Sequence, residues 1–403
     1  MNIKKQIRCL YLYEAIICFR MIDVVWVLFL LGRGYSLAEV GIAEGVFHVT
    51  SIIFEIPSGM AADLFGRKRT LILSGLVGTC SCIFMMLDGW RGWIYPGMIL
   101  SALSINLASG TEEALTYDSL LDAGREKDYA GIYSRMGVIG RISSALSCTV
   151  SPIAIAAGYR YTYLATAFLN LGAVLAVLGL REPRVTKEQR ERKENSCKDN
   201  WIRLTRHVQA TLAFIREHPQ TMGKLFANAA LACPCFLIMM YLQEHLVNCG
   251  WPKSWIGIPM VVIPLAGAAG AWMAGKNRMG LLKAVFVCAF LSGMGTCLTG
   301  SSILACSVFG ACVARGCEGF IGIVISENVN RQFTSSQRAT LISVDSMLYS
   351  VLMVAASPLT GFIGNHYSVS AIFYVLGGTL ILSAVVFGLL YRKRNRRVTV
   401  YRQ

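Results

Sequence analysis

The sequence predicts an all-α integral membrane protein of twelve transmembrane helices, arranged as two bundles of six. Three observations support this fold class. Hydrophobic residues make up 55% of the 403 residues and charged residues only 15%, far from an average soluble domain. Apolar segments of about 20 residues, the length that crosses a bilayer as a helix, recur along nearly the whole chain. Basic residues are concentrated in alternate connections between these segments.

Polar breaks place the twelve expected spans. They are residues 9–32, 38–62, 70–88, 93–118, 131–157, 160–181, 221–247, 252–274, 281–300, 302–328, 339–365 and 369–391. The break between the fifth and sixth spans is short enough for a miscount there. The expected domains are an N-terminal bundle (1–181), a cytoplasmic central loop (182–220), a C-terminal bundle (221–391) and a basic cytoplasmic tail (392–403).

The central loop begins with a proline-containing, highly charged stretch of the kind that stays solvated. Its second part has an apolar face at about 100° per residue, made by Trp201, Leu204, Val208, Leu212 and Ile215. This pattern predicts an amphipathic helix on the inner leaflet rather than another span.

The distribution of basic residues sets the expected orientation. Placing the N-terminus in the cytoplasm leaves only Arg33, Arg91, Arg160 and Lys253 in the outer connections. By the positive-inside rule both termini are then cytoplasmic, and we expect a bacterial inner membrane. The basic residues of the cytoplasmic segments account for the net charge of +15 without a nucleic-acid partner, and the expected surroundings are the lipid bilayer.

Catalytic and metal-binding patterns are missing from the sequence. Nearly all of the fourteen cysteines fall within apolar spans, where buried thiols are expected rather than disulfides or a metal site. We found no phosphate-binding loop, paired histidine spacing or nucleophile motif. The sequence therefore predicts neither an enzyme nor a cofactor.

The two halves resemble one another. Glu113 precedes Pro152 by 39 residues, and Glu318 precedes Pro358 by 40 residues. A parallel repeat of two six-helix halves is typical of a rocking transporter, with the substrate site between the halves near the bilayer midplane.

A charged motif interrupts the apolar pattern after the second span. The stretch "EIPSGMAADLFGRKRT" contains Gly59, Asp63, Gly66, Arg67 and Lys68. This spacing resembles the loop signature of the major facilitator superfamily, and with the six-plus-six layout the resemblance covers the whole chain. It implies that Asp63, Arg67 and Lys68 form a charge-relay latch that holds the outward-facing state. The alternative is that the basic residues only follow the positive-inside rule.

Residues around this motif bear on the branch of the family. Glu55 and Pro57, just before it, resemble the variant of clostridial-type tetracycline efflux pumps and many relatives of unassigned substrate. Asn106 stands where proton-coupled members carry an arginine, and most glycines of the fifth-span antiporter motif are absent. The second-half counterpart "AGKNRMG" has Asn277 in place of the aspartate. The resemblance thus implies transport more firmly than export.

The second span carries a polar stripe. Glu44, His48, Ser51 and Glu55 fall on one face at about 100° per residue. Because ionisable groups within a membrane are costly and usually face a cavity or a partner, this face is expected to line water or substrate, with either glutamate carrying a proton. The alternatives are solvation of Glu44 at the outer interface and helix packing of Glu55 through Pro57.

The fourth span carries a second polar group. Asn106, Gly110, Glu113 and Tyr117 share a face, and Glu112 points about 120° away. Glu113 is the candidate for the cavity, whereas Glu112 is expected to pair with a neighbouring helix. Both glutamates lie near the expected end of the span, so the alternative is that they are cytoplasmic-end residues.

Three arginines are embedded in the spans. Arg20 lies three residues before Asp23, and Arg315 three residues before Glu318, so each can pair locally on a helix. Arg141 has no such local partner, and an inter-helical bond to a glutamate of the fourth span is the hypothesis for it.

Together these patterns predict an alternating-access secondary transporter that moves a small organic molecule. Proton exchange is the expected energy source and efflux of a drug-like compound the leading interpretation. Nutrient or metabolite uptake is the alternative within the same class, and a membrane-embedded ligand sensor is the alternative outside it. The family resemblance implies a monomer.

Overall fold

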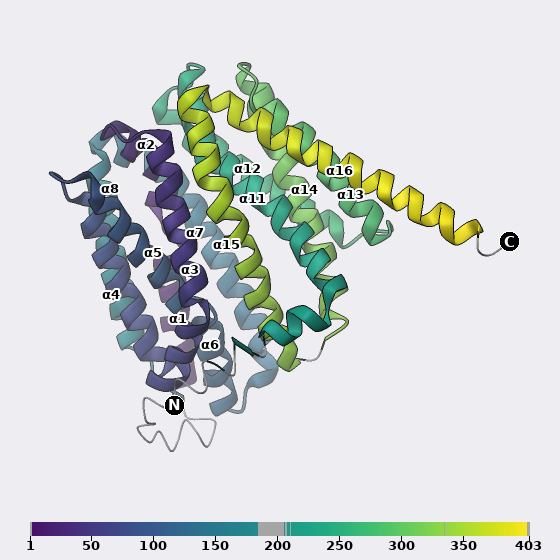
Figure 1. Cartoon of the computed structure of the whole chain (residues 1–403). Coiled ribbons are helices and arrows are strands. Elements are labelled where there is room, and N and C mark those ends of the chain that lie inside the picture. The colour runs from purple at the N-terminus through teal and green to yellow at the C-terminus, as the bar shows by residue number, and fades with distance from the viewer. Residues whose placement is uncertain (1, 184–204, 206–207, 210, 334, 401–403) are drawn as a thin grey trace. The chain divides into compact units, whose positions relative to one another are not determined.

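The computed structural model describes residues 2–183, 205, 208–209, 211–333 and 335–400 (Figure 1). Every regular element among them is helical, which confirms the predicted all-α class. The chain divides into two compact units. The first consists of Met1–Trp26 and Ala43–Glu217, and the second of Val27–Ile42 and His218–Gln403.

Most expected spans appear as long helices. Those starting in the first half are α1 (Ile3–Ile17), α2 (Trp26–Gly32), α3 (Leu37–Phe65), α4 (Arg67–Met86), α5 (Ile94–Ala108), α6 (Thr111–Asp122), α7 (Tyr129–Ala157) and α8 (Tyr159–Leu178). Short 3-10 turns lie at Met21–Val24, Arg91–Trp93, Glu126–Asp128 and Lys253–Trp255. The second half contributes α11 (Pro219–Asn248), α12 (Gly257–Ala274), α13 (Leu281–Thr299), α14 (Leu304–Asn330), α15 (Ser335–His366) and α16 (Val369–Val400).

Ten segments of the described chain are long and apolar enough to cross a membrane. The first of them, Ile3–Gly32, joins α1 and α2 through a 3-10 turn. The expected fourth span is broken into α5 and α6. Gly110, with φ +70°, occupies the left-handed region at this break, which glycine adopts without steric penalty. The other expected span outside the ten is α7, which carries Arg135 and Arg141.

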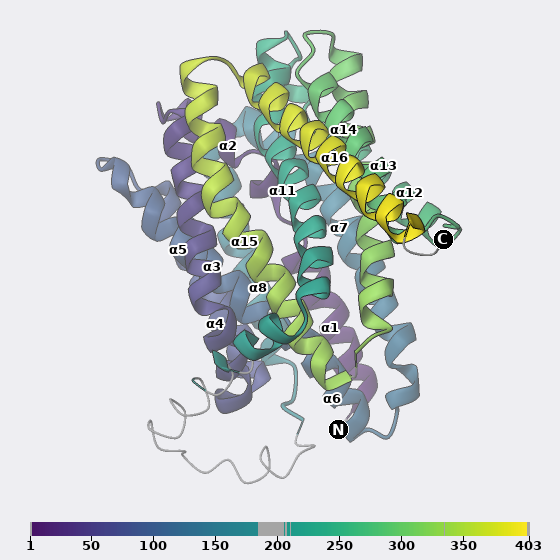
Figure 2. The same cartoon turned by 45° about the vertical axis from the view of Figure 1, so that its right-hand side comes forward.

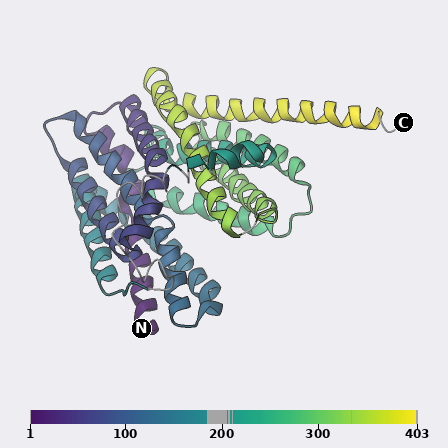
Figure 3. The ribbon, with the colours of Figure 1, turned by 60° about the horizontal axis from the view of Figure 1, so that its bottom comes forward.

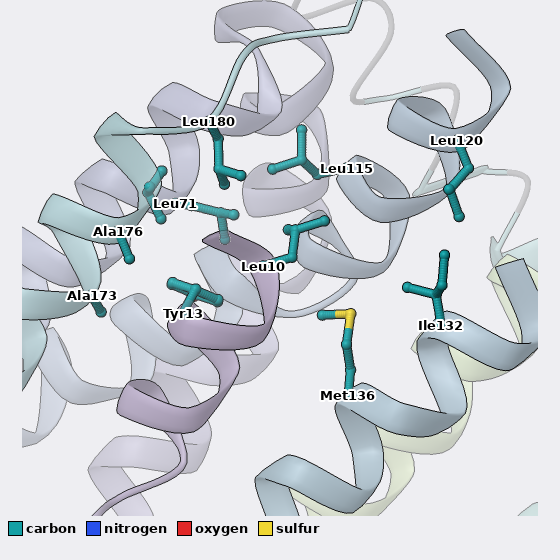
Figure 4. Close-up of a cluster of buried hydrophobic side chains, with 11 residues drawn as sticks. Leu10, Tyr13, Leu71, Leu115, Leu120, Ile132, Met136, Ala173, Ala176 and Leu180 are labelled. Carbon is teal, nitrogen blue, oxygen red and sulfur yellow. The ribbon is translucent and has the colours of Figure 1, made fainter. Parts of the chain in front are cut away.

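The core of the first unit joins five helices (Figure 4). Its buried members are Leu10 and Tyr13 of α1, Leu71 of α4, Leu115 and Leu120 of α6, Ile132 and Met136 of α7, and Ala173, Ala176, Val177 and Leu180, which come from α8 and the residues just after it. Leu10 and Tyr13 lie three residues apart and share one face of α1. This packing holds α6 and α7 against α1. Glu14, the residue after Tyr13, contacts α7 at Gly140.

In the second unit, α12 and α14 approach closely through glycines. A Cβ atom at Gly270 would overlap the carbonyl of Gly316, and one at Gly319 would overlap the carbonyl of Gly267. Small residues let membrane helices pack backbone to backbone. This contact fixes the stretch of α14 that carries Arg315.

The second unit ends in two long helices, α15 and α16 (Figure 2). Most of the expected basic tail continues α16, which Figure 3 shows as one long helix. The expected amphipathic helix of the central loop lies largely outside the described residues. Of its described part, residues 211–217 are helical, and Leu212 is exposed whereas Phe214 is buried.

Candidate functional site

The polar stripe of α3 is largely buried. Glu44 and His48 are each 4% exposed, and Ser51 is 8% exposed. His48 Nε2 lies 3.3 Å from Glu44 Oε1, one helical turn away. Glu55, the fourth member of the stripe, is partly buried. Two titratable side chains therefore contact each other on one buried face of an apolar helix.

Ser51 connects this face to α5. Its hydroxyl donates to Asn106 Oδ1 at 2.9 Å, and Asn106 Nδ2 donates back to the Ser51 carbonyl at 2.8 Å. Asn106 is buried as well. The residue at the position of the family's arginine thus joins two helices through neutral hydrogen bonds.

A pair of carboxyl groups lies between α1 and α6. Glu112, in the first turn of α6, lies near Glu14 of α1. Glu14 Oε1 also accepts from Cys18 Sγ at 3.3 Å. The backbone of α7 passes close by at Gly140, where an added Cβ atom would overlap Glu14 Oε1. Glu112 therefore lies near a helix that carries another acid, and its expected pairing with that helix stays a prediction.

Sequence reasoning missed Glu14. Its carboxyl group could have identified Glu14 as a candidate, because an acid inside an apolar span is a functional candidate by default. The nearness of the two acids had no local signal, because Glu14 and Glu112 lie on helices far apart in the chain.

Glu113 takes different partners from its neighbour. Its carboxylate accepts from the Tyr129 hydroxyl at 2.9 Å and from the Tyr133 hydroxyl at 3.5 Å. The ring of Tyr117 packs edge-on against that of Tyr129, with 5.2 Å between centroids. Glu113 and Arg141 are both exposed, and no ion pair joins Arg141 to either glutamate of α6 in the described part of the chain.

The charged motif joins α4 to its neighbours. The guanidinium of Arg67 forms an ion pair with Asp118 of α6 and donates to the Ala114 carbonyl. Lys68 Nζ donates to the carbonyls of Leu178 and Leu180 at 2.8 and 2.7 Å. These contacts satisfy carbonyls at the end of α8, where cations are favourable.

A distant acid caps α4. Glu182 accepts from the backbone N–H groups of Arg67 at 2.9 Å and Lys68 at 2.7 Å. These are two of the N–H groups that lack a partner within a helix, and a carboxylate there also interacts favourably with the helix dipole. Gly66, with φ +97°, makes the turn from α3 into α4. Asp63 and Gly59 are exposed, and the latch role of Asp63 stays a prediction.

The two local ion pairs are present. Arg20 Nε lies 3.3 Å from Asp23 Oδ1, and Arg315 Nη1 lies 3.0 Å from Glu318 Oε2. Their spacing of three residues predicts this pairing. Each pair leaves its arginine neutralised within its own segment of chain.

The second unit holds a further polar cluster that sequence reasoning missed. Asn228 Nδ2 of α11 lies 3.3 and 3.2 Å from the two carboxylate oxygens of Asp345 on α15. One turn earlier on α11, Lys224 Nζ donates to Asn328 Oδ1 of α14 at 2.8 Å. The charges of Lys224 and Asp345 inside apolar spans were the available signal.

Each unit thus presents ionisable and amide side chains on apolar helices. Within the described residues, no three His, Cys, Asp or Glu side chains are grouped so that they could hold a metal ion. The groups present can exchange protons and can donate or accept hydrogen bonds to a polar solute.

Comparison with known proteins gives one consistent family. The family model described as Major Facilitator Superfamily matches residues 15–328 and 277–400. An uncharacterised MFS-type transporter of Bacillus subtilis, YxaM, is 22% identical over 382 residues, which cover 93% of each chain.

Solved structures share the fold at low sequence identity. The nucleoside transporter NupG has a TM-score of 0.75 at 12% identity, covering 97% of this chain and 99% of that one. The D-xylose-proton symporter has a TM-score of 0.68 at 11% identity, covering 96% and 95%. Because the family model matches most of the sequence, the chain belongs to the major facilitator superfamily and is a multi-pass membrane transporter rather than an enzyme.

Proposed function

We propose that the chain is a proton-coupled secondary transporter that exports a small, drug-like organic molecule across a bacterial inner membrane by alternating access. The observation that carries the proposal is a set of acidic side chains on the apolar helices of a superfamily transporter. They are Glu14, Glu44, Glu112, Glu318 and Asp345. Acids in such positions are rare and commonly belong to proton or substrate pathways.

The expected substrate carries polar groups on an apolar body. Glu44 with His48 offers both a donor and an acceptor on a predominantly apolar helix. Such a mixture suits an amphiphilic molecule, since apolar contacts supply affinity and a few polar groups fix orientation. A monomer with both termini in the cytoplasm is the proposed working form, and the basic connections support that orientation.

Export is supported by the stretch Glu55–Lys68, which resembles that of tetracycline efflux relatives. Uptake is the second candidate. It is favoured by the fold neighbours, whose names are those of a nucleoside transporter and a D-xylose-proton symporter. Export by exchange moves protons against the direction of the compound, whereas uptake by symport moves both in the same direction.

The test uses everted vesicles with an acidic lumen. We expect a tetracycline, macrolide or lipophilic cation to enter the lumen while protons leave it, with no response in vesicles lacking the protein. Nucleosides, sugars and dipeptides are tested in right-side-out vesicles, where uptake would carry protons inward. Silence in both orientations from well-expressed protein would contradict coupled transport of these compounds and favour a ligand sensor.

A further inference from the structure

In the described part of the second unit, a lysine and an aspartate lie on apolar helices without a counter-charge. We propose that Lys224 and Asp345 form a binding site for a small zwitterion, with its carboxylate at Lys224 and its ammonium group at Asp345. The assignment rests on the function proposed above, since it names the class of molecule that is transported. Binding itself can be measured without any transport.

Lys224 is held by a neutral side chain. It is partly buried near the start of α11, and its Nζ donates to Asn328 Oδ1 of α14 at 2.8 Å. Gln332 Nε2 donates to the same oxygen at 3.1 Å, which fixes the amide group. An ammonium group has three donors, and this bond uses one of them. No carboxylate among the described residues forms an ion pair with Lys224, so its charge is available to an anionic group.

Asp345 is likewise held by a neutral side chain. It is partly buried on α15, and its two carboxylate oxygens lie 3.3 and 3.2 Å from Asn228 Nδ2. An ionised carboxylate has about four acceptor positions, so it can accept further N–H groups. Within residues 211–333 and 335–400, no lysine, arginine or histidine pairs with it. Because a charge inside a span is costly and commonly marks a substrate pathway, this carboxylate points to a cationic group on the ligand.

One face of α11 links the two charges. Lys224 and Asn228 are four residues apart, which places them on the same face of the helix, and Asn228 is the residue that contacts Asp345. Four residues correspond to roughly 6 Å along the helix axis. α11 packs against both α14 and α15, and a Cβ atom added at Gly322 of α14 would lie 3.7 Å from Asn228 Oδ1. A short molecule with opposite charges at its two ends matches this arrangement.

The surroundings favour charge pairing with a ligand. Leu225 and Ala229 of α11 and Leu341 and Val344 of α15 are buried, and opposite charges attract more strongly in apolar surroundings than in water. The cluster lies at the end of the unit where α11 and α15 begin and α14 ends. The positive-inside rule predicts that this end is cytoplasmic, which is the side from which an exporter takes up its substrate.

Calorimetric titration of the purified full-length protein measures binding directly. The probes are ω-amino acids of increasing length, from glycine to aminohexanoate, which hold the same two charges at growing separations. Hexanoate and hexylamine, with one charge each, are the ligand controls. We expect an affinity maximum at one chain length and at least about tenfold weaker binding of either control, because each lacks one charge-assisted contact. No binding by any ω-amino acid, or equal binding of the zwitterions and the controls, would overturn the proposal.

Matched variants assign each end of the ligand. Lys224→Gln and Asp345→Asn remove the two charges and keep hydrogen-bonding groups, while Lys283→Gln and Glu327→Gln remove exposed charges on α13 and α14 and serve as controls. Converting the carboxylate of the probe into a methyl ester should weaken binding to the parent and to both controls. It should cause no further loss in Lys224→Gln, and N-acetylation of the probe should cause no further loss in Asp345→Asn. Equal losses in the parent and in these two variants would contradict the assignment.

Thermal unfolding of the same variants tests whether the two charges serve each other instead of a ligand. In that case the double variant Lys224→Gln/Asp345→Asn would recover the stability that each single variant loses, and the parent would show no response to any zwitterion. This combination would overturn the proposal.

Transport assays in vesicles fail independently of the binding assays. A zwitterion that binds but is not transported in either orientation would contradict the proposed function and support the site. Transport of a compound with a single charge, by a protein that binds no zwitterion, would support the proposed function and overturn the site.

Discussion

Replacing Asp118 by alanine tests how the charged motif is anchored. Arg67 and Asp118 join α4 to α6 through side chains that are only 17% and 10% exposed. The substitution leaves the partly buried Arg67 guanidinium with its hydrogen bond to the Ala114 carbonyl on α6 but without the Asp118 carboxylate. The perturbation therefore removes the charge that compensates an enclosed cation.

The size of the effect follows from this burial. Removing one partner of a buried ion pair costs roughly 3–5 kcal/mol. Because both side chains keep some exposure and Arg67 keeps one carbonyl, we expect the lower end, about 3 kcal/mol. For units of this size, 1 kcal/mol shifts the melting temperature by roughly 2–4 °C, so the expected loss is on the order of 6–12 °C.

Thermal unfolding of the detergent-solubilised protein, followed by tryptophan fluorescence, measures the change. Asp122→Ala is the matched control, because Asp122 lies one turn further along α6 and is exposed. Its melting temperature should stay close to that of the parent. Equal melting temperatures for Asp118→Ala and Asp122→Ala would refute the reasoning that the Arg67 pair anchors α4.

Three further substitutions test other contacts by the same melt. Gly270→Ala would overlap the backbone of α14 and should lower the free energy of unfolding by about 1–3 kcal/mol. Gly280→Ala has open space around it and should leave stability unchanged, so equal effects of the two variants would contradict close packing. Asn106→Ala loses both bonds to Ser51 and should cost about 1–2 kcal/mol, with the double variant Ser51→Ala/Asn106→Ala less destabilised than the sum; strict additivity would exclude coupling. Glu182→Gln weakens the α4 cap and should cost roughly 0.5–2 kcal/mol, an effect that high salt reduces; no change would show that the cap contributes nothing.

The fold could be predicted because its main signal is local. Apolar length defines a span without knowledge of its partners, and the all-α class followed from it. The local ion pairs of Arg20 and Arg315 were also predictable, since three residues on a helix bring two side chains together. The helix break at Gly110 could not be predicted. Glycine can adopt the left-handed backbone conformation found there, but it is also common in unbroken helices of membrane proteins, so its presence alone does not mark a break.

The contacts between helices were beyond sequence reasoning. Glu14 and Glu112 lie near each other because α1 and α6 pack on a common core, and no spacing in the chain encodes that proximity. Asp118 and Asp345 likewise gain their partners only through packing. For Arg141, the hypothesised bond to a glutamate of the fourth span is not formed within the described residues, and Glu113 accepts from the Tyr129 hydroxyl instead.

The most direct test of proton-coupled transport compares the parent and Glu44→Gln in acidified everted vesicles, recording lumenal pH and labelled compound together. The proposal predicts that at least one compound enters parent vesicles with release of protons, and that Glu44→Gln exchanges the compound without releasing protons. Entry of the compound into parent vesicles with no proton movement would contradict proton coupling.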